Sequence, residues 1–578
     1  MKPFLKFTPI ALSCALVACA GPAPQSEFAP VTTGGLYSEF SQEAAAEGRY
    51  TPFVAGALAQ QSLSFSDSAA YYLRALEVDP SNRLIANRAF FQLLYAGRME
   101  EAAKIAVTIS EDKEAVFNDD LVSILYVLEA FNRQDWEAVR ARLSRVEMTG
   151  FGGMLSPLLA GWSYAAQNDI EGAETALADM VADIRLKPIA DEHRAYMLDH
   201  LSQFEQAEEQ YRLIADAAQP LSLQPFVAYA DMLARTGKRA EAREFLGEQA
   251  VRFSNNNFLL REGQLIAAGL RPTQQSANPQ GAVGGTFYRL ASEFSRSSSP
   301  RAAVIYLRIA SYLTPQIADI YFMLGNLMDD LENPAEAAKA YGAVPSTSGL
   351  SVIAEERRIN ALRRGGDVAA AEAALRTAIR DNPRQSLYLV ALGDILRERR
   401  EFGEAILYYS QAIDLNKSSG RQDWFAFFAR GVSHEQSKDW PKAESDFLQA
   451  LTLSPDEPSV LNYLGYSWID RGMRVDEAKG LIEKAVEQRP EDGFIIDSLG
   501  WVNYLTGDYA EAVRLLEKAV RIEPDDVTIN HHLGDAYWRV GRFIEARFQW
   551  QHAIDSKPDA EELAELRVKM DMGLREDS

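Results

Sequence analysis

The chain has 578 residues, of which 47% are apolar and 24% charged, and its formal net charge is −23. One hydrophobic core does not extend over such a length, so the composition predicts several domains or an array of stacked repeats. An acidic protein of this kind repels phosphates, which argues against a nucleic-acid partner. The two cysteines, Cys14 and Cys19, lie too near the start to build a disulfide framework in the rest of the chain.

The first residues have the composition of an export signal. Lys2 and Lys6 give a basic start, and the apolar run from Thr8 to Ala18, 11 residues long, is too short to span a bilayer as a helix. The run ends in Leu16-Val17-Ala18-Cys19, which resembles the lipobox of bacterial lipoproteins. The resemblance implies a signal peptide over residues 1–18 and acyl chains such as palmitate on Cys19. A leader cut after a small-x-small motif, without lipidation, is the alternative.

The residues after Cys19 indicate where the rest of the chain lies. Ala20 stands where lipoproteins retained in the inner membrane of Gram-negative bacteria carry aspartate. The resemblance therefore implies a lipid anchor in the outer membrane and a body that faces the periplasm. Residues 19–46 begin with a stretch rich in Pro, Gly, Ser and Thr, and we predict that they form the lipidated cysteine and a flexible tether.

One period of about 34 residues runs through most of the remaining sequence. Near the carboxyl end Gly500 and Gly534 lie 34 residues apart, as do Ala512 and Ala546, and a proline such as Pro558 follows each unit. This pattern is similar to that of the tetratricopeptide (TPR) repeat, which has a small residue in the middle of helix A and an alanine early in helix B. Small residues at both places let the two helices approach closely.

The same period, followed toward the amino end, gives 14 units. Their helix A markers are Gly56, Phe90, Tyr126, Gly161, Ala195, Ala230, Ala291, Gly325, Ile359, Gly393, Gly431, Gly465, Gly500 and Gly534. The early position of helix B holds alanine in 13 of the 14 units and Ser68 in the other. So regular a pattern predicts stacked helix pairs that share a continuous core.

We therefore predict an all-α fold, a TPR superhelical solenoid of about 14 helix pairs. Residues 47–250 are expected to form an amino-terminal, divergent TPR-like array, and residues 285–558 a carboxyl-terminal TPR array. Residues 251–284 do not fit a repeat, and we predict an irregular linker that divides the solenoid into two arrays. Residues 559–578 are expected to form a capping helix and a tail.

The sequence lacks the motifs of common catalytic and metal sites. The segment from His434 to Lys438 begins like a zinc-protease helix but has no second histidine, and the adjacent His531 and His532 would point to different sides of a helix. Neither a nucleophile elbow nor a phosphate-binding loop is present in the sequence. We predict that the chain is not an enzyme and binds no metal and no cofactor.

A candidate binding surface follows from the positions of helix A that face inward in TPR proteins. When the small marker is counted as position 8, these are positions 2, 5, 9, 12 and 13. In this chain they carry Phe322, Asn326, Phe425, Phe428, Asn462, Tyr466, Phe494, Trp501, Tyr504, His531, Trp538 and Arg539. Rings beside amides and charges suit an extended peptide, whereas the alternative is that several of these rings belong to the core between repeats.

The lipobox together with the repeats from Gly56 to Pro558 resembles the long TPR lipoproteins of Gram-negative envelopes. One member of that group is the outer-membrane adaptor of a periplasmic carboxyl-terminal processing protease and gathers its peptidoglycan-hydrolase substrates. The resemblance implies a scaffold or adaptor that binds such envelope proteins. An assembly or activating factor for cell-wall synthesis or a secretion complex is an alternative, and a cell-wall-remodelling enzyme is another.

Overall fold

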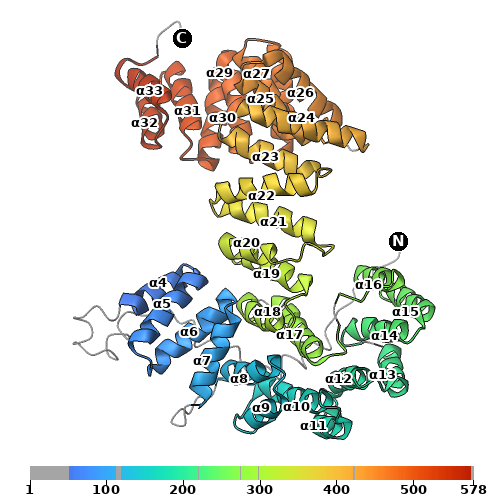
Figure 1. Ribbon diagram of the computed structural model, residues 1–578. Coiled ribbons are helices and arrows are strands. Elements are labelled where there is room, and N and C mark those ends of the chain that lie inside the picture. Colours follow the sequence, from blue (N-terminus) through green and yellow to red (C-terminus); the bar gives the residue numbers. More distant parts are fainter. Residues whose placement is uncertain are drawn as a thin grey trace. The chain divides into compact units, whose positions relative to one another are not determined.

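In a computed structural model, the chain is described over residues 51–111, 119–218, 220–273, 275–296, 299–420 and 423–574. These residues form 30 helices, α4 to α33, and no strands (Figure 1). The predicted signal peptide, Cys19 and the tether lie outside the described residues. None of the described helices combines the length and the hydrophobicity that a bilayer crossing requires.

The described residues cluster into two compact units, which we call unit 1, ending at Asp367, and unit 2, starting at Val368. The helices of unit 1 are α4 (Thr51–Gln61), α5 (Phe65–Val78), α6 (Arg83–Ala96), α7 (Met99–Glu111), α8 (Asp120–Asn132), α9 (Trp136–Leu143), α10 (Gly150–Ala165), α11 (Ile170–Ala182), α12 (Lys187–His200), α13 (Phe204–Asp216), α14 (Gln224–Arg235), α15 (Arg239–Arg252), α16 (Asn257–Ala267), α17 (Pro279–Arg296), α18 (Pro300–Leu313), α19 (Ala318–Asp330), α20 (Pro334–Gly342) and α21 (Ser351–Arg364).

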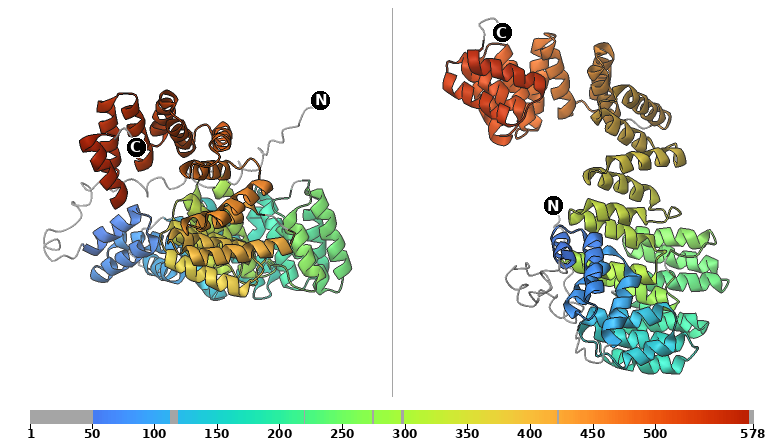
Figure 2. Two further views of the ribbon diagram at one scale, coloured as in Figure 1. Left: turned by 90° about the horizontal axis from the view of Figure 1, so that it is seen from above. Right: turned by 60° about the vertical axis from the view of Figure 1, so that its left-hand side comes forward.

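Unit 2 continues the same alternation of helices A and B. Its helices are α22 (Val368–Asp381), α23 (Ser386–Glu398), α24 (Phe402–Ser418), α25 (Trp424–Gln436), α26 (Trp440–Leu453), α27 (Pro458–Asp470), α28 (Val475–Gln488), α29 (Gly493–Leu505), α30 (Tyr509–Ile522), α31 (Val527–Arg539), α32 (Phe543–Asp555) and α33 (Ala560–Met572). Figure 2 shows the helices from two further directions. Apart from α16 and α33, the helices of both units follow one another as 14 successive pairs, so the predicted all-α solenoid is confirmed.

The repeat markers lie where helix A meets helix B. All 14 markers are buried, and a Cβ atom added to Gly431 would lie 2.7 Å from the ring of Phe447 on the paired helix. The early helix B positions are fully buried except Ala138, which is half-buried beside the buried Val139. Ser68, the one exception to alanine, donates a hydrogen bond to the carbonyl of Gly56 at 2.8 Å. Close approach of the two helices therefore accounts for the periodic small residues.

The range predicted as an irregular linker, residues 251–284, contains two helical segments. Helix α16 occupies its centre, and α17 already begins at Pro279. The side chain of Asn256 caps α16 by accepting hydrogen bonds from the backbone N–H groups of Phe258 and Leu259. Leu259 and Ile266 bury one face of this helix. A helix without TPR markers thus lies between the sixth and seventh helix pairs.

Unit 1 closes on itself through contacts between residues that are far apart in sequence. The Arg308 side chain on α18 donates to the carbonyl of Tyr95, at the end of α6, over 3.2 Å and a separation of 213 residues. Asn333 donates to the carbonyl of Leu63 at 2.8 Å. Ser66 donates to the Glu336 carboxylate on α20 at 3.2 Å. The first two helix pairs therefore pack against α18 and the start of α20.

Helices α17 and α18 pack against the A helices of the amino-terminal array. Phe151 on α10 contacts Phe287 on α17 and Tyr306 on α18, with ring centroids 5.7 and 5.5 Å apart. His193 on α12 is hydrogen-bonded to the Thr286 hydroxyl on α17 at 3.0 Å. The helix A side of this array is therefore occupied by the chain's own seventh helix pair.

His193 gives unit 1 a testable pH dependence. Its ring is buried and accepts a hydrogen bond from Trp162 at 2.9 Å, and burial, with a smaller effect of Arg289, lowers the pKa of His193 to about 3. The unfolded chain, with a pKa of about 6.5, takes up this proton first, so the free energy of unfolding falls by about 1.4 kcal/mol per pH unit below that value. We expect the free energy of unfolding of the wild type to fall by about 2 kcal/mol between pH 7 and pH 5 because of this residue. A His193→Gln variant should not show this part of the fall. Urea denaturation at both pH values measures this difference, and equal losses in the two proteins would contradict the prediction.

Candidate protein-binding cleft

Unit 2 contains a cleft of about 670 Å³ on the helix A side of four successive repeats. We call it the unit 2 cleft. Its walls come from the end of α25, from α27 and α29, and from the start of α31 with the loops beside them. It is lined by Glu435, Gln436, Lys438, Asn462, Tyr463, Tyr466, Ser467, Asp470, Arg471, Phe494, Asp497, Ser498, Asp526, Thr528 and Ile529. Three of the twelve groove residues predicted from the sequence, Asn462, Tyr466 and Phe494, come together here.

The aromatic side chains of the cleft offer contact area to a partner. Phe494 stands in the first turn of α29, which Asp492 caps, and its side chain is 54% exposed. Tyr466 is half-buried on α27, and burial, reinforced by Asp497 and Asp470, raises its pKa to about 12. Tyr466 therefore keeps its proton at physiological pH, and its hydroxyl can donate a hydrogen bond. Rings with an open face and a polar end are common at protein interfaces.

One hydrogen-bond acceptor in the cleft is unsatisfied. The Oδ1 atom of Asn462 is buried and has no hydrogen-bond partner among the described residues. A buried acceptor without a partner costs free energy, so a donor that reaches it on binding gains more than an average hydrogen bond would. A backbone N–H group of an extended peptide is such a donor.

The charges of the cleft are mainly negative. The charge of Glu435 is neutralised, since its carboxylate accepts one hydrogen bond from Ser467 at 2.8 Å and lies 3.0 Å from Arg471. Asp497 accepts a hydrogen bond from His532 at 3.0 Å. The Asp470 side chain is 67% exposed and has Arg471 at 3.8 Å, beyond hydrogen-bonding distance. The cleft can therefore receive cationic or hydrogen-bond-donating groups of a partner.

The other predicted groove residues of α19 and α25 take part in packing. Phe322 lies in unit 1 against Tyr341, with ring centroids 5.8 Å apart, and the Tyr341 hydroxyl donates to Asn326 at 2.8 Å. Phe428 packs between the rings of Phe447 and Tyr463 on the neighbouring helices. Phe425, the remaining predicted groove residue of α25, is half-buried beside Trp424, with ring centroids 5.8 Å apart. Contacts inside and between repeats account for the positions of these rings.

On α29, the predicted ring of Trp501 is stacked within unit 2. It lies on His532 and on Tyr504, with centroid distances of 3.9 and 4.7 Å. Tyr504 is 8% exposed and accepts a hydrogen bond from Arg539 at 3.3 Å. Trp501, Tyr504 and Arg539 thus stabilise the junction between the last two repeats.

Helix α33 covers the predicted groove residues of the last repeat. The ring of His531 is hydrogen-bonded to Glu562 at 3.1 Å and to Lys569 at 2.6 Å, both on α33. Trp538 packs against Trp550, with centroids 5.4 Å apart, and lies so close to Gly573 that a Cβ atom there would overlap its ring. These two side chains therefore hold the final helix in place.

The acidic residues of the cleft were not among the groove residues predicted from the sequence. Asp470 and Asp497 stand at positions 13 and 5 of their repeats, which are inward positions, whereas the predicted surface was chosen for its rings and amides. The signal that could have identified them was therefore present in the same register. Within the described ranges, His, Asp and Glu side chains form no group of three that could hold a metal ion.

Two family models match parts of the chain. A model described as a tetratricopeptide repeat matches residues 357–420, and one described as a TPR repeat matches residues 502–541. These matches show TPR repeats at residues 357–420 and 502–541, and the 14 helix pairs of the described residues have the same arrangement of helices A and B. TPR repeats of this kind indicate a scaffold for protein–protein interaction.

The chain is also similar to individual proteins. It is 30% identical over 195 residues to a TPR repeat-containing protein of Pseudomonas aeruginosa, which covers 34% of this chain and 32% of that relative. The match thus spans about a third of the relative's length.

Similar solved structures include a TPR protein from Parabacteroides merdae, at 17% identity, with 44% of this chain and 98% of that chain covered and a TM-score of 0.37. They also include the APC/C hetero-tetramer Cut9–Hcn1, at 12% identity, with 93% and 98% covered and a TM-score of 0.37.

Proposed function

We propose that this TPR protein is an adaptor of the bacterial envelope, which is anchored in the outer membrane through Cys19, faces the periplasm and binds other envelope proteins through the unit 2 cleft. The observation that carries the proposal is the cleft itself. It combines the exposed ring of Phe494, the unsatisfied acceptor of Asn462 and the carboxylate of Asp470 on adjacent repeats. The A helices of the amino-terminal array, by contrast, pack against α17 and α18.

An extended segment of a partner protein fits the chemistry of this cleft best. Its apolar side chains would pack on Phe494 and Tyr466, its backbone N–H groups would reach Asn462, and a cationic side chain would pair with Asp470. Among envelope proteins, we propose a periplasmic carboxyl-terminal processing protease and its cell-wall substrates. The resemblance to the long TPR lipoproteins supports this choice of partner.

Photocrosslinking in living cells tests the site of binding. We would place the photoreactive residue p-benzoylphenylalanine at Phe494 and, in a matched control, at Phe548, a phenylalanine of α32 that is 67% exposed. Crosslinks from position 494 to defined envelope proteins, the protease among them, are the expected result. The same products from both positions, or none from position 494, would contradict the assignment of the cleft.

The anchor is tested separately. A Cys19→Ser variant has no thiol to receive the diacylglyceryl group, so it should incorporate no labelled palmitate, because the thioether link to that group and the later acylation of the new terminal amine both depend on Cys19. Several acyl chains on one residue hold a protein stably at a bilayer, whereas a polypeptide without acyl chains has no comparable affinity for the membrane. We expect membrane pellets to contain the wild type and to lose the variant. Equal labelling and sedimentation of the two proteins would contradict lipidation at Cys19.

A further inference from the structure

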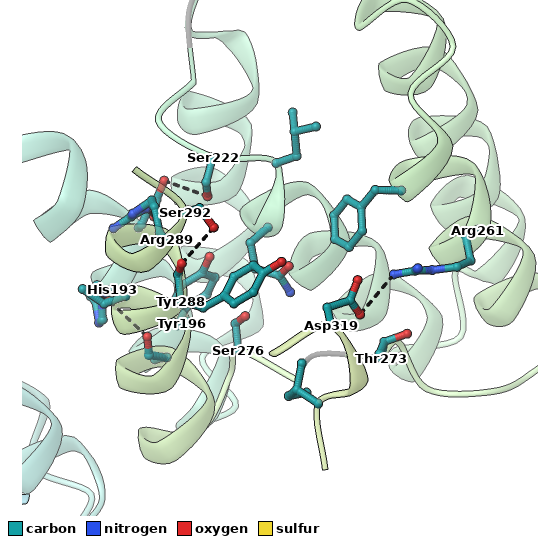
Figure 3. Close-up of a pocket in the computed structure, with 18 of the residues that line it drawn as sticks. His193, Tyr196, Ser222, Arg261, Thr273, Ser276, Tyr288, Arg289, Ser292 and Asp319 are labelled. Atoms are coloured by element: carbon teal, nitrogen blue, oxygen red, sulfur yellow. Dashed lines mark hydrogen bonds and ion pairs between the residues drawn. The ribbon is translucent and has the colours of Figure 1, made fainter. Parts of the chain in front are cut away.

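A second pocket lies within unit 1, where α12, α14, α16, α17 and α19 meet (Figure 3). We call it the unit 1 pocket. Its volume of about 370 Å³ is at the lower end of the range of roughly 300–1,000 Å³ that is typical of small-molecule sites. Nothing in the TPR pattern requires a cavity here, because α16 and the segment that leads to α17 lie outside the repeats.

The largely apolar wall of this pocket includes polar side chains that are deeply buried. Glu192 is 3% exposed and Ser276 is 2% exposed. The Ser276 hydroxyl lies beside the Tyr196 hydroxyl and acts on its pKa as a hydrogen-bond donor. Simple packing voids are apolar, whereas buried polar groups are nearly always paired. Buried polar and charged groups that meet at a cavity therefore point to a ligand that carries hydrogen-bonding groups.

Arg289 lies on one side of the pocket, and most N–H donors of its guanidinium group are available to a ligand. It donates from Nη1 to Glu192 at 2.6 Å, and this is its one hydrogen bond in the described part of the chain. A guanidinium group has five N–H donors in a planar fork, which matches the geometry of a carboxylate. Ser222, which donates to Glu192 at 3.3 Å, lies on the same side and lines the pocket too.

The opposite side carries a carboxylate that is weakly paired. Figure 3 shows Asp319 beside Arg261, across the pocket from Arg289. The Asp319 oxygen lies 3.7 Å from Arg261, which is too far for a hydrogen bond, and the side chain is 32% exposed. The rings of Tyr196 and Tyr288 also line the pocket. Burial and then the charge of Asp319 raise the pKa of Tyr288 to about 12.

We propose that the unit 1 pocket binds a small zwitterion of the amino-acid or short-peptide class, with its carboxylate on Arg289 and its ammonium group on Asp319. A simple anion would meet Glu192 beside Arg289, and a simple cation would meet Arg261 beside Asp319. A ligand with both charges finds an opposite partner at each end, while its apolar part packs on the tyrosine rings.

Calorimetric titration of the full chain tests the ligand class. The probes are a library of free amino acids and dipeptides, and the same dipeptides with an N-acetyl or a C-amide cap. We expect free-ended members to bind, and each cap to weaken binding at least about tenfold because it removes one charge. Equal affinity for free and capped dipeptides would overturn the proposal, as would the absence of binding by every free-ended probe at millimolar concentration.

Two matched variants on α19 test the position of the site. Asp319→Asn should weaken binding of the free dipeptide at least about tenfold, because it removes the partner of the ammonium group. Asp330→Asn, at an exposed residue of the same helix, should leave binding unchanged. A double Glu192→Gln and Arg289→Gln variant removes the proposed partner of the ligand carboxylate. Because both charges of the buried pair are removed together, neither is left unpaired. Wild-type affinity in either pocket variant, with an unchanged circular-dichroism spectrum, would overturn the proposal.

Discussion

Replacing both Phe494 and Tyr466 with alanine should lower the affinity of the unit 2 cleft for its protein partner by at least about 30-fold. Both rings line the cleft, and the Phe494 ring is 54% exposed in the absence of a partner. Truncation of an aromatic anchor at the centre of an interface costs more than about 1 kcal/mol of binding free energy, so the loss of two such rings costs at least about 2 kcal/mol. Binding of the purified partner, measured by calorimetry or surface plasmon resonance, gives the change directly.

The control for this prediction is Phe548→Ala. Phe548 is 67% exposed on α32 and is absent from the lining of the cleft, so its truncation should leave affinity unchanged. Because Tyr466 is half-buried, urea denaturation of each variant separates loss of binding from loss of stability. The single Phe494→Ala variant removes little core contact and should still weaken binding about tenfold. Equal weakening by Phe494→Ala and Phe548→Ala would show that the partner binds elsewhere.

The solenoid could be predicted from the sequence because its cause is local and periodic. Each unit needs one small residue in helix A and another in helix B, where the two helices touch. Gly431 against Phe447 and Gly393 against Tyr409 show the contact, since an added Cβ atom would lie 2.7 Å from either ring. Because this requirement recurs every 34 residues, the period can be recognised even in units whose marker is a large residue, such as Phe90 or Ile359.

The binding surface could be predicted only in part, because the helical period says which side a residue faces and not what covers that side. Trp538 and Phe494 both occupy inward positions. Gly573, at the end of α33, lies against the ring of Trp538, whereas the ring of Phe494 is exposed. The same limit applies to the amino-terminal array, whose A helices meet α17 and α18 through contacts such as that of Phe151 with Phe287. Contacts between distant segments of this kind have no counterpart in the repeat pattern.

Arg308→Ala should destabilise unit 1 by about 2–3 kcal/mol, because it removes a charged donor from the Tyr95 carbonyl and one partner from the buried Glu336 carboxylate. Arg308 is 9% exposed, lies 3.5 Å from Glu336 and donates to the carbonyl of Tyr95. Without it, the Tyr95 carbonyl loses a donor and Glu336 keeps Lys339 and Ser66 as its remaining partners. The loss should appear in urea denaturation of the full chain as earlier unfolding of unit 1.

The same variant tests whether Arg308 holds the first two helix pairs against α18. Amide hydrogen exchange should accelerate in α4 to α7, since these helices lose their link to α18, and should stay unchanged in unit 2. Arg212→Ala is the control, because Arg212 forms an exposed ion pair with Glu208 at 2.6 Å, and such pairs contribute at most about 1 kcal/mol. If Arg308→Ala exchanged and unfolded like Arg212→Ala, the closure of unit 1 would depend on its apolar contacts rather than on this buried arginine.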